Sequence, residues 1–203
     1  MAMPELAITA LVIFSYLAGG IPTGYLVVKR LKGLDIRKHG SGNPGTANVY
    51  RVAGARAGLI TLMMDALKGF LPVMIARLLY PNGPELMILC GGAAIVGHDW
   101  TPFLGFSGGK GVATSAGVFA AMAPSALICA AVVFITAVRL SRHISIGSMA
   151  GAACLPAFNW LWGSGPAVVA ASAAASTLIL YKHIPNMKRL LHKEELLFHG
   201  KKY

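Results

Sequence analysis

The stretch LITLMMDALKGFLPVMIA, residues 59–76, decides how this chain is built. Its only charged residues are Asp65 and Lys68, and it lies within an apolar run that extends from about 57 to 80. About 20 such residues suffice for a helix to cross the hydrocarbon core of a bilayer. The run therefore predicts a transmembrane helix.

Asp65 and Lys68 are three positions apart, which places them on one face of the predicted helix. Charges inside the hydrocarbon region are costly and are generally paired. We expect Asp65 and Lys68 to form a mutual ion pair or a tether to a neighbouring helix. A role in substrate binding is the second alternative.

The composition extends the membrane assignment to the whole chain. Of 203 residues, 56% are hydrophobic and 12% are charged, and the mean hydropathy is +0.65, which leaves too little polar surface for a water-soluble globule. We expect one polytopic membrane domain over 1–203.

The net charge of +11 fits contact with anionic lipid better than contact with nucleic acid. Three cysteines, Cys90, Cys129 and Cys154, lie in separate apolar stretches and are expected to be packed side chains.

The remaining apolar runs cover approximately 6–28, 86–104, 112–138, 144–162 and 166–181. The run 112–138 is ambiguous, because Pro124 removes a helical hydrogen bond and restricts the residue before it. A break at this proline gives seven spans, with the N-terminus outside and the C-terminus cytoplasmic. An unbroken run gives six spans and places the two main basic segments on opposite sides of the membrane.

The positive-inside rule selects seven transmembrane helices. The loop 29–56 holds seven of the 18 Lys and Arg residues, and with seven spans the inner segments together hold 16 of the 18. This topology also gathers four polar segments on the cytoplasmic side: 40–51, 97–111, 141–148 and 182–189. Loops that are far apart in the sequence can then share one site on that face.

The segment GSGNPGTANVYR, residues 40–51, has the glycine spacing of a dinucleotide-binding fingerprint. That fingerprint requires a buried strand before the first glycine, whereas the preceding sequence is strongly charged. The cofactor interpretation is therefore set aside, although glycines still allow backbone N–H groups to approach an anion. Ser41 and Asn43 could equally be turn formers, and Arg51 is one basic residue among several.

A second glycine-rich segment surrounds Lys110 with Gly108, Gly109 and Gly111. A compact ammonium among exposed backbone donors suits phosphate oxygens. The segment is not a Walker loop, because Leu104 and Gly111 stand where that motif needs glycine and Ser or Thr. The alternative is a flexible turn whose lysine faces lipid headgroups.

Among the six histidines, His183 is the best candidate for chemistry. Asn186 follows three residues later and can face the same point if a helical turn forms across Pro185. His98 and Asp99, near the inner end of a predicted span, more often satisfy backbone groups or cap a helix, and the remaining histidines lie in basic or interfacial surroundings: His39, His143, His192 and His199. No metal site is expected, because no ligand spacing is present.

Three stretches together resemble the bacterial acyl-phosphate-dependent glycerol-3-phosphate acyltransferases, the PlsY family: GSGNPGTANVYR (40–51), GHDWTPFLGFSGGKGVAT (97–114), and HIPNMKRLL (183–191) followed by a glutamate. The resemblance implies transfer of a fatty acyl group from acyl phosphate to the 1-hydroxyl of glycerol 3-phosphate, which gives lysophosphatidic acid. Acyl-CoA and acyl carrier protein are not the implied donors. It further implies a multi-pass protein of the bacterial cytoplasmic (inner) membrane, in contact with membrane lipid, without a cofactor or an obligate protein partner.

The same resemblance implies roles for individual residues. Catalytic roles fall on Ser41, Arg51, Lys110, His183 and Asn186. Substrate or phosphate contacts fall on glycines and small polar residues: Gly40, Gly42, Asn43, Gly108, Gly109, Gly111, Ser145 and Ser148. Only one serine is needed between the fifth and sixth spans, and we favour Ser148 over Ser145.

The residues suit this reaction on chemical grounds. An acyl phosphate already has a good leaving group, so the enzyme mainly has to bring two anions together and screen their charge. No histidine is followed by an aspartate with four residues between them, so the His-x4-Asp pair of the other glycerol phosphate acyltransferase class is absent. The proton acceptor is either His183 or a phosphate oxygen. The rival interpretation is a small transporter for an anionic solute, but no inverted repeat is seen and the polar groups lie on one face.

Overall fold

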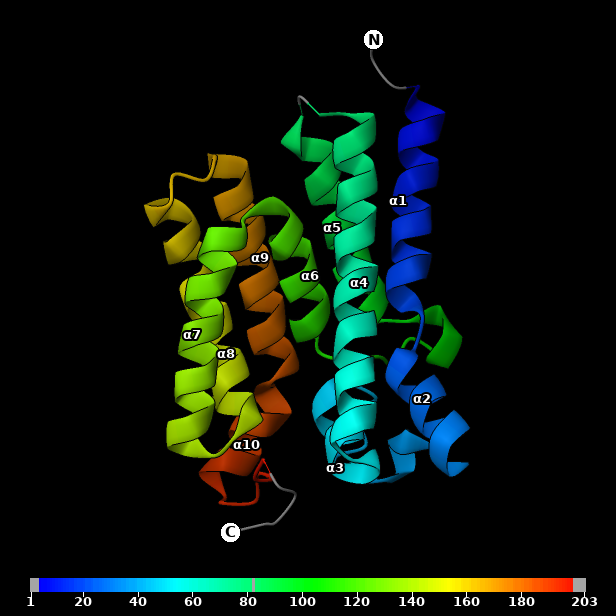
Figure 1. Ribbon diagram of the computed structural model, residues 1–203, viewed down its shortest axis with the longest axis vertical. Helices are drawn as coiled ribbons and strands as arrows, with labels where there is room; N and C mark the ends of the chain where they lie inside the picture. Colours follow the sequence, from blue (N-terminus) through cyan, green and yellow to red (C-terminus); the bar gives the residue numbers. More distant parts are fainter. Residues whose placement is uncertain (1–3, 82, 199–203) are drawn as a thin grey trace.

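The computed structural model describes residues 4–81 and 83–198, and their secondary structure is entirely helical. The long helices stand side by side (Figure 1): α1 (Glu5–Gly20), α4 (Ala55–Leu79), α5 (Pro84–Asp99), α7 (Pro124–Ser141), α8 (Ile144–Leu161) and α9 (Pro166–Lys182). Short helices gather at the lower end: α2 (Thr23–Lys32), α3 (Thr46–Ala53) and α10 (Ile184–Leu191). Two single 3-10 turns are η1 (Ile36–Lys38) and η2 (Pro102–Leu104). His199, Lys201 and Lys202 lie outside the described residues.

Four helical segments of the described chain are long and apolar enough to cross a bilayer: Glu5–Lys32, Ala55–Leu79, Pro124–Ser141 and Ile144–Leu161. A fifth qualifies if α9 and α10, which are bent by 49° relative to each other, form one span. Helix α5 has 16 residues and α6 (Val112–Met122) has 11, fewer than a full crossing requires. These lengths agree with a polytopic protein, while the count of seven spans stays a prediction.

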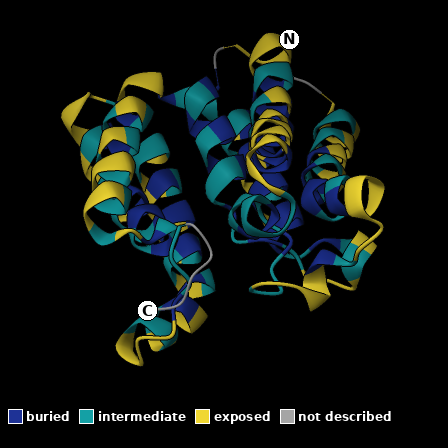
Figure 2. Ribbon diagram, turned by 60° about the horizontal axis from the view of Figure 1, so that its bottom comes forward, coloured by how far each residue is buried: buried dark blue, intermediate teal, exposed yellow. Residues whose placement is uncertain are grey.

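The outward faces of the long helices are apolar. Leu59, Ile128 and Trp160 are 57%, 65% and 72% exposed, and Figure 2 shows exposed residues along the outer faces with buried residues between the helices. Contiguous apolar surface of this kind indicates contact with lipid. The bundle thus has one apolar exterior and one packed interior.

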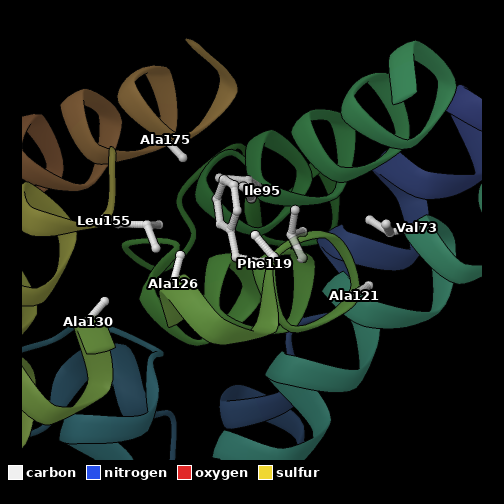
Figure 3. Packing of buried hydrophobic residues seen from close by; sticks show 10 residues of the cluster. Val73, Ile95, Phe119, Ala121, Ala126, Ala130, Leu155 and Ala175 are labelled. Atoms are coloured by element: carbon white, nitrogen blue, oxygen red, sulfur yellow. The ribbon is translucent and has the colours of Figure 1, made fainter. Parts of the chain in front are cut away.

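The interior centres on α6, a helix of 11 residues. Phe119 of α6 is 1% exposed and packs in one cluster with residues of α4, α5, α8 and α9: Val73, Ile95, Leu155 and Ala175 (Figure 3). Two glycines let α4 and α6 approach closely, because a Cβ at Gly69 would lie 2.2 Å from the Thr114 carbonyl oxygen and one at Gly117 would lie 1.9 Å from the Ala66 carbonyl oxygen. Small residues at such contacts are typical of helices packed in membranes.

The predicted break at Pro124 is confirmed. Helix α6 ends at Met122 and α7 begins at Pro124, where the first-turn position makes the missing N–H harmless. The predicted continuous first run, 6–28, is interrupted: α1 ends at Gly20 and α2 begins at Thr23. Pro22, which precedes α2, cannot donate to the α1 backbone ladder, so the run becomes two helices in place of one.

The predicted pairing of Asp65 and Lys68 is also confirmed. Lys68 Nζ lies 2.8 Å from Asp65 Oδ1, and both side chains are buried. The same two residues tether neighbouring segments, since Thr23 donates its hydroxyl hydrogen to Asp65 and Lys68 donates to the Ile21 carbonyl oxygen at 2.8 Å. Both parts of the sequence-based expectation therefore hold.

Candidate active site

The first glycine-rich loop is shaped by a buried amide, Asn48. Asn48 Oδ1 accepts a hydrogen bond from the Ser41 N–H at 2.9 Å, and its Nδ2 donates to the His39 carbonyl oxygen at 2.9 Å. Gly40 has φ +62°, and a Cβ there would lie 2.1 Å from Asn48 Oδ1. Glycine is thus required at 40, and Asn48 fixes the backbone that presents Ser41.

Asn43 joins this loop to the second glycine-rich segment. Its Nδ2 donates to the Gly108 carbonyl oxygen at 3.3 Å, and its Oδ1 accepts from the Gly45 N–H at 2.9 Å. Gly42, between Ser41 and Asn43, has φ +74°. The two loops predicted to share a site therefore do meet, although they are far apart in the sequence.

The second loop is held against the end of α5. The Gly108 N–H donates to the Asp99 carbonyl oxygen at 3.2 Å, and the Gly109 N–H donates to the His98 carbonyl oxygen at 3.0 Å. The sequence-based expectation of exposed donors at these two glycines is therefore wrong for this structure. Their N–H groups are used in contacts with α5 that shape the loop. Whether the loop binds phosphate stays a prediction.

Lys110 and Gly111 complete this loop and lead into α6. Gly111 follows with φ +72° as the N-cap of α6, so the first-turn N–H groups of α6 start directly after the lysine. Helix N-termini carry N–H groups without intrahelical partners and a positive end of the helix dipole. Lys110 and the start of α6 together suit a phosphate group.

Lys110 contacts the third predicted segment directly. Its ammonium donates to Asn186 Oδ1, and Asn186 Nδ2 donates to Glu195 Oε1 at 2.5 Å. Arg189 Nε then donates to Glu195 Oε2 at 2.7 Å. These four residues form a continuous polar chain that connects the glycine-rich loop, α10 and the segment after α10.

Two residues of this polar chain, Lys110 and Glu195, have shifted pKa values. Burial, and next the charge of Arg189, lowers the pKa of Lys110 to about 8. Burial alone would raise the pKa of Glu195, but hydrogen bonds from Asn186 and Arg189 bring it below its ordinary value. At neutral pH Lys110 is therefore still mainly an ammonium, about one pH unit below its pKa, and it lies beside an ionised carboxylate.

His183 lies next to this cluster, at the junction of α9 and α10. It is buried, and its Nδ1 lies 2.7 Å from the Ile179 carbonyl oxygen. Burial, and next the charge of Lys110, lowers the pKa of His183 to about 4. A neutral imidazole whose Nδ1–H bonds to this carbonyl leaves Nε2 as an acceptor.

The helical turn expected between His183 and Asn186 forms in spite of Pro185. The Asn186 N–H donates to the His183 carbonyl oxygen at 2.9 Å, and α10 begins at Ile184. Proline is tolerated in the first turn of a helix, where its missing N–H would have no intrahelical partner. The proline therefore helps to start α10.

Arg51 contacts the segment after α10. Its Nε donates to the Leu197 carbonyl oxygen at 3.2 Å and its Nη2 donates to the Leu196 carbonyl oxygen at 3.3 Å. The neighbouring Tyr50 ring stacks on Phe198, with ring centroids 4.8 Å apart. Residues 194–198, here called the C-terminal strap, thus bring Arg51 of α3 to the same end of the bundle as Lys110.

Comparison with known proteins places this arrangement in a family. The family model described as glycerol-3-phosphate acyltransferase matches residues 9–193. The chain belongs to this family. A relative named glycerol-3-phosphate acyltransferase from Desulforudis audaxviator is 41% identical over 98% of this chain and 100% of its own, and a second from Moorella thermoacetica is 46% identical over 88% and 91%.

Two solved structures have the same fold as this acyltransferase-family chain. They are described as PlsY (YgiH), an integral membrane glycerol 3-phosphate acyltransferase, in a glycerol 3-phosphate form and a lysphosphatidic acid form. Both are 35% identical and cover 94% of this chain and 95% of their own, with TM-scores of 0.89 and 0.88. The chain therefore has an all-helical integral membrane fold like that of PlsY.

Within this family fold, the two candidate serines differ in their surroundings. Ser145 lies next to Glu195 and contributes to its lowered pKa. Ser148, which the sequence analysis favours, donates its hydroxyl to the Ile144 carbonyl oxygen of its own helix at 2.9 Å. The two hydroxyls lie one helical turn apart, and the surroundings favour Ser145, which is the nearer one to Glu195; the choice between Ser145 and Ser148 stays a prediction.

Sequence reasoning missed two residues of this arrangement, Glu195 and Asn48. Glu195 had one signal, the glutamate that follows HIPNMKRLL in the third motif. Asn48 lies within the first motif, GSGNPGTANVYR, but its contacts with the backbone of the loop could not be predicted from that position alone. The specific roles of the predicted site residues stay predictions, now with a geometry that can be tested.

Proposed function

We propose that this chain transfers a fatty acyl group from acyl phosphate to the 1-hydroxyl of glycerol 3-phosphate, giving lysophosphatidic acid and phosphate. One observation carries the proposal: in a fold shared with PlsY, Lys110 bonds to Asn186 at the end of the bundle where the glycine-rich loops and Arg51 also lie. The substrates are two anions, and this end of the molecule supplies their counter-charges.

The chemistry requires positioning more than activation. The hydroxyl oxygen of glycerol 3-phosphate attacks the carbonyl carbon of acyl phosphate, and the bond from that carbon to the phosphate oxygen breaks. Lys110 and Arg51 screen the two phosphate groups, which otherwise repel each other. The contact of Lys110 with Asn186 and the contacts of Arg51 with the C-terminal strap hold these cations in place before the substrates arrive, so little reorganisation is needed during the reaction.

The proton of the attacking hydroxyl passes to a phosphate oxygen. His183, with its pKa lowered to about 4, is a weak base, whereas phosphate oxygens titrate near neutral pH, at about 6 for a phosphate ester. His183 Nε2 accepts a hydrogen bond from the substrate hydroxyl and orients it. The released phosphate then carries the proton away, so charge and protons balance without another co-reactant.

The protein spans the bacterial inner membrane seven times, with the N-terminus outside and the site on the cytoplasmic face. Segments α5 and α6 cross as short helices, sheltered by their neighbours. Labelling tests this topology: a cysteine introduced by Lys201→Cys should react only after the membrane is permeabilised, and one introduced by Gly165→Cys should react in intact cells. Labelling of Lys201→Cys from outside would refute the orientation.

The activity test uses purified protein in detergent, supplied with acyl phosphate and glycerol 3-phosphate. Wild-type protein should release phosphate and form lysophosphatidic acid without a sealed vesicle, which a transporter would need. Lys110→Ala should lower kcat/KM by about 10- to 150-fold, since a charge-assisted hydrogen bond contributes about 1.5–3 kcal/mol. Lys188→Ala, an exposed lysine on α10, is the matched control and should leave activity unchanged. Product formation that depends on acyl-CoA would overturn the donor assignment.

A further inference from the structure

A second polar cluster lies inside the bundle, next to the glycine-rich loop. Asp65 Oδ1 accepts hydrogen bonds from the Thr23 hydroxyl and from Lys68 Nζ, the latter at 2.8 Å. His98 Nδ1 of α5 lies 3.7 Å from the same carboxylate oxygen. Asp65, Lys68 and His98 are all buried, and the proposed mechanism uses none of them.

The cluster is anchored on the side away from the site. Lys68 donates to the Ile21 carbonyl oxygen, at the break between α1 and α2, at 2.8 Å. Asp65 is fixed by Thr23, the first residue of α2. Three helices, α2, α4 and α5, therefore hold one carboxylate, which in turn limits where the His98 ring can sit.

The His98 ring forms the floor of the loop that carries Lys110. A Cβ at Gly109 would lie 1.9 Å from His98 Nε2 and 2.7 Å from its Cε1, so the ring faces Gly109 at van der Waals distance. The Gly109 N–H also donates to the His98 carbonyl oxygen. The cavity beside these groups measures about 10 Å³, about the space of one water molecule, so the loop has no room to sink toward the cluster.

We propose that His98, held by the Asp65–Lys68 pair, is a positioning residue that sets the location of Lys110 in the site. The inference rests on the proposed function, in which Lys110 binds phosphate. One edge of the ring faces the Asp65 carboxylate and the opposite edge faces Gly109, the residue before the lysine. The buried ion pair of α4 thereby acts on the reaction without touching substrate.

A compensating pair of variants tests the contact. Gly109→Ala places a methyl group into the His98 ring and should lower kcat/KM by about 100-fold, the effect of a displacement of about 1 Å at an active site. His98→Ala removes the ring and makes room for that methyl group. The double variant should therefore be at least about tenfold more active than Gly109→Ala alone.

Gly108→Ala is the matched control for this rescue. A Cβ at Gly108 would lie 2.0 Å from the backbone carbonyl oxygen of His98, which no side-chain change removes. Gly108→Ala should stay impaired in the His98→Ala background. Equal rescue of both glycine variants, or additive losses in the Gly109→Ala double variant, would overturn the proposal.

A second measurement distinguishes a positioning role of His98 from a general loss of stability. In His98→Ala alone, we expect the loop to loosen and water to reach Lys110, so the pH above which kcat/KM falls should be higher than in wild-type protein. A purely structural role would lower the melting temperature and leave this pH unchanged, which would refute the inference. Absence of activity in wild-type protein would instead refute the proposed function, so the two failures are distinguishable.

Discussion

Raising the pH from 7 to 9 should weaken phosphate recognition at Lys110. In the free protein, burial and next the charge of Arg189 lower the pKa of this lysine to about 8. Below that pH the side chain is an ammonium, and above it an increasing fraction is a neutral amine. Because only the ammonium balances a phosphate charge, kcat/KM for glycerol 3-phosphate should fall as the pH rises through about 8.

The size of the effect follows from linkage between proton and substrate binding. A bound phosphate favours the charged ammonium, so the pKa of Lys110 is higher in the complex than in the free protein. Affinity then falls about tenfold for each pH unit above 8, which gives a loss of about tenfold between pH 7 and 9. His183, with a pKa of about 4, does not titrate in this range, and the phosphate ester stays a dianion above about pH 6.

The assay measures initial rates in detergent at saturating acyl phosphate, because kcat/KM reports ionisations of the free enzyme. Calorimetric binding of glycerol 3-phosphate without the acyl donor separates affinity from donor hydrolysis at high pH. Lys110→Arg is the control: a guanidinium stays charged, so its lower residual activity should not change between pH 7 and 9. A flat wild-type profile, or the same fall in Lys110→Arg, would refute the reasoning.

Three further predictions concern the neighbours of Lys110. His183→Gln should keep kcat within about tenfold of wild type and raise KM for glycerol 3-phosphate, whereas a thousandfold fall in kcat would identify His183 as the general base. Glu195→Gln should lower the melting temperature and lower kcat/KM by about 10- to 100-fold, because the charge-assisted bond from Arg189 is weakened; unchanged values would contradict the polar chain. Ser145→Ala should reduce kcat/KM more than Ser148→Ala, and the reverse order would restore the original preference.

Several features of the fold could be predicted because they depend on local sequence. Hydropathy located the long helices, and Pro124 marked the boundary between α6 and α7, since proline acts on its own turn of helix. The pairing of Asp65 and Lys68 followed from helical spacing and from the cost of an isolated charge in hydrocarbon. None of these inferences needed knowledge of which helices are neighbours.

The interruption of the first apolar run was missed although its proline was visible. Hydropathy averages over about 20 residues, so it does not detect a break of two residues. The break at Ile21–Pro22 has a structural role. It leaves the Ile21 carbonyl oxygen able to accept a hydrogen bond from the Lys68 ammonium. A local signal was thus present, but its consequence depended on a lysine of another helix.

The site was predictable as a set of residues and not as a set of contacts. The motifs indicated that Lys110 and Asn186 belong together, and they are hydrogen-bonded. The motifs did not indicate that the N–H groups of Gly108 and Gly109 bind α5, because glycine in a loop fits both an exposed donor and a close backbone contact. Only the position of α5 distinguishes these two uses.

The C-terminal strap explains how so many cations can share one end of the bundle. Lys110, Arg51 and Arg189 repel one another, and the charges of Arg189 and Arg51 help to lower the pKa of Lys110. Glu195 offsets part of this repulsion, and the carbonyl oxygens of Leu196 and Leu197 hold Arg51. One carboxylate does not neutralise three cations, so the free site keeps an excess of positive charge. In the proposed reaction, the two substrate phosphate groups supply the missing negative charge, and we expect their binding to raise the pKa of the lysine that burial and repulsion had lowered.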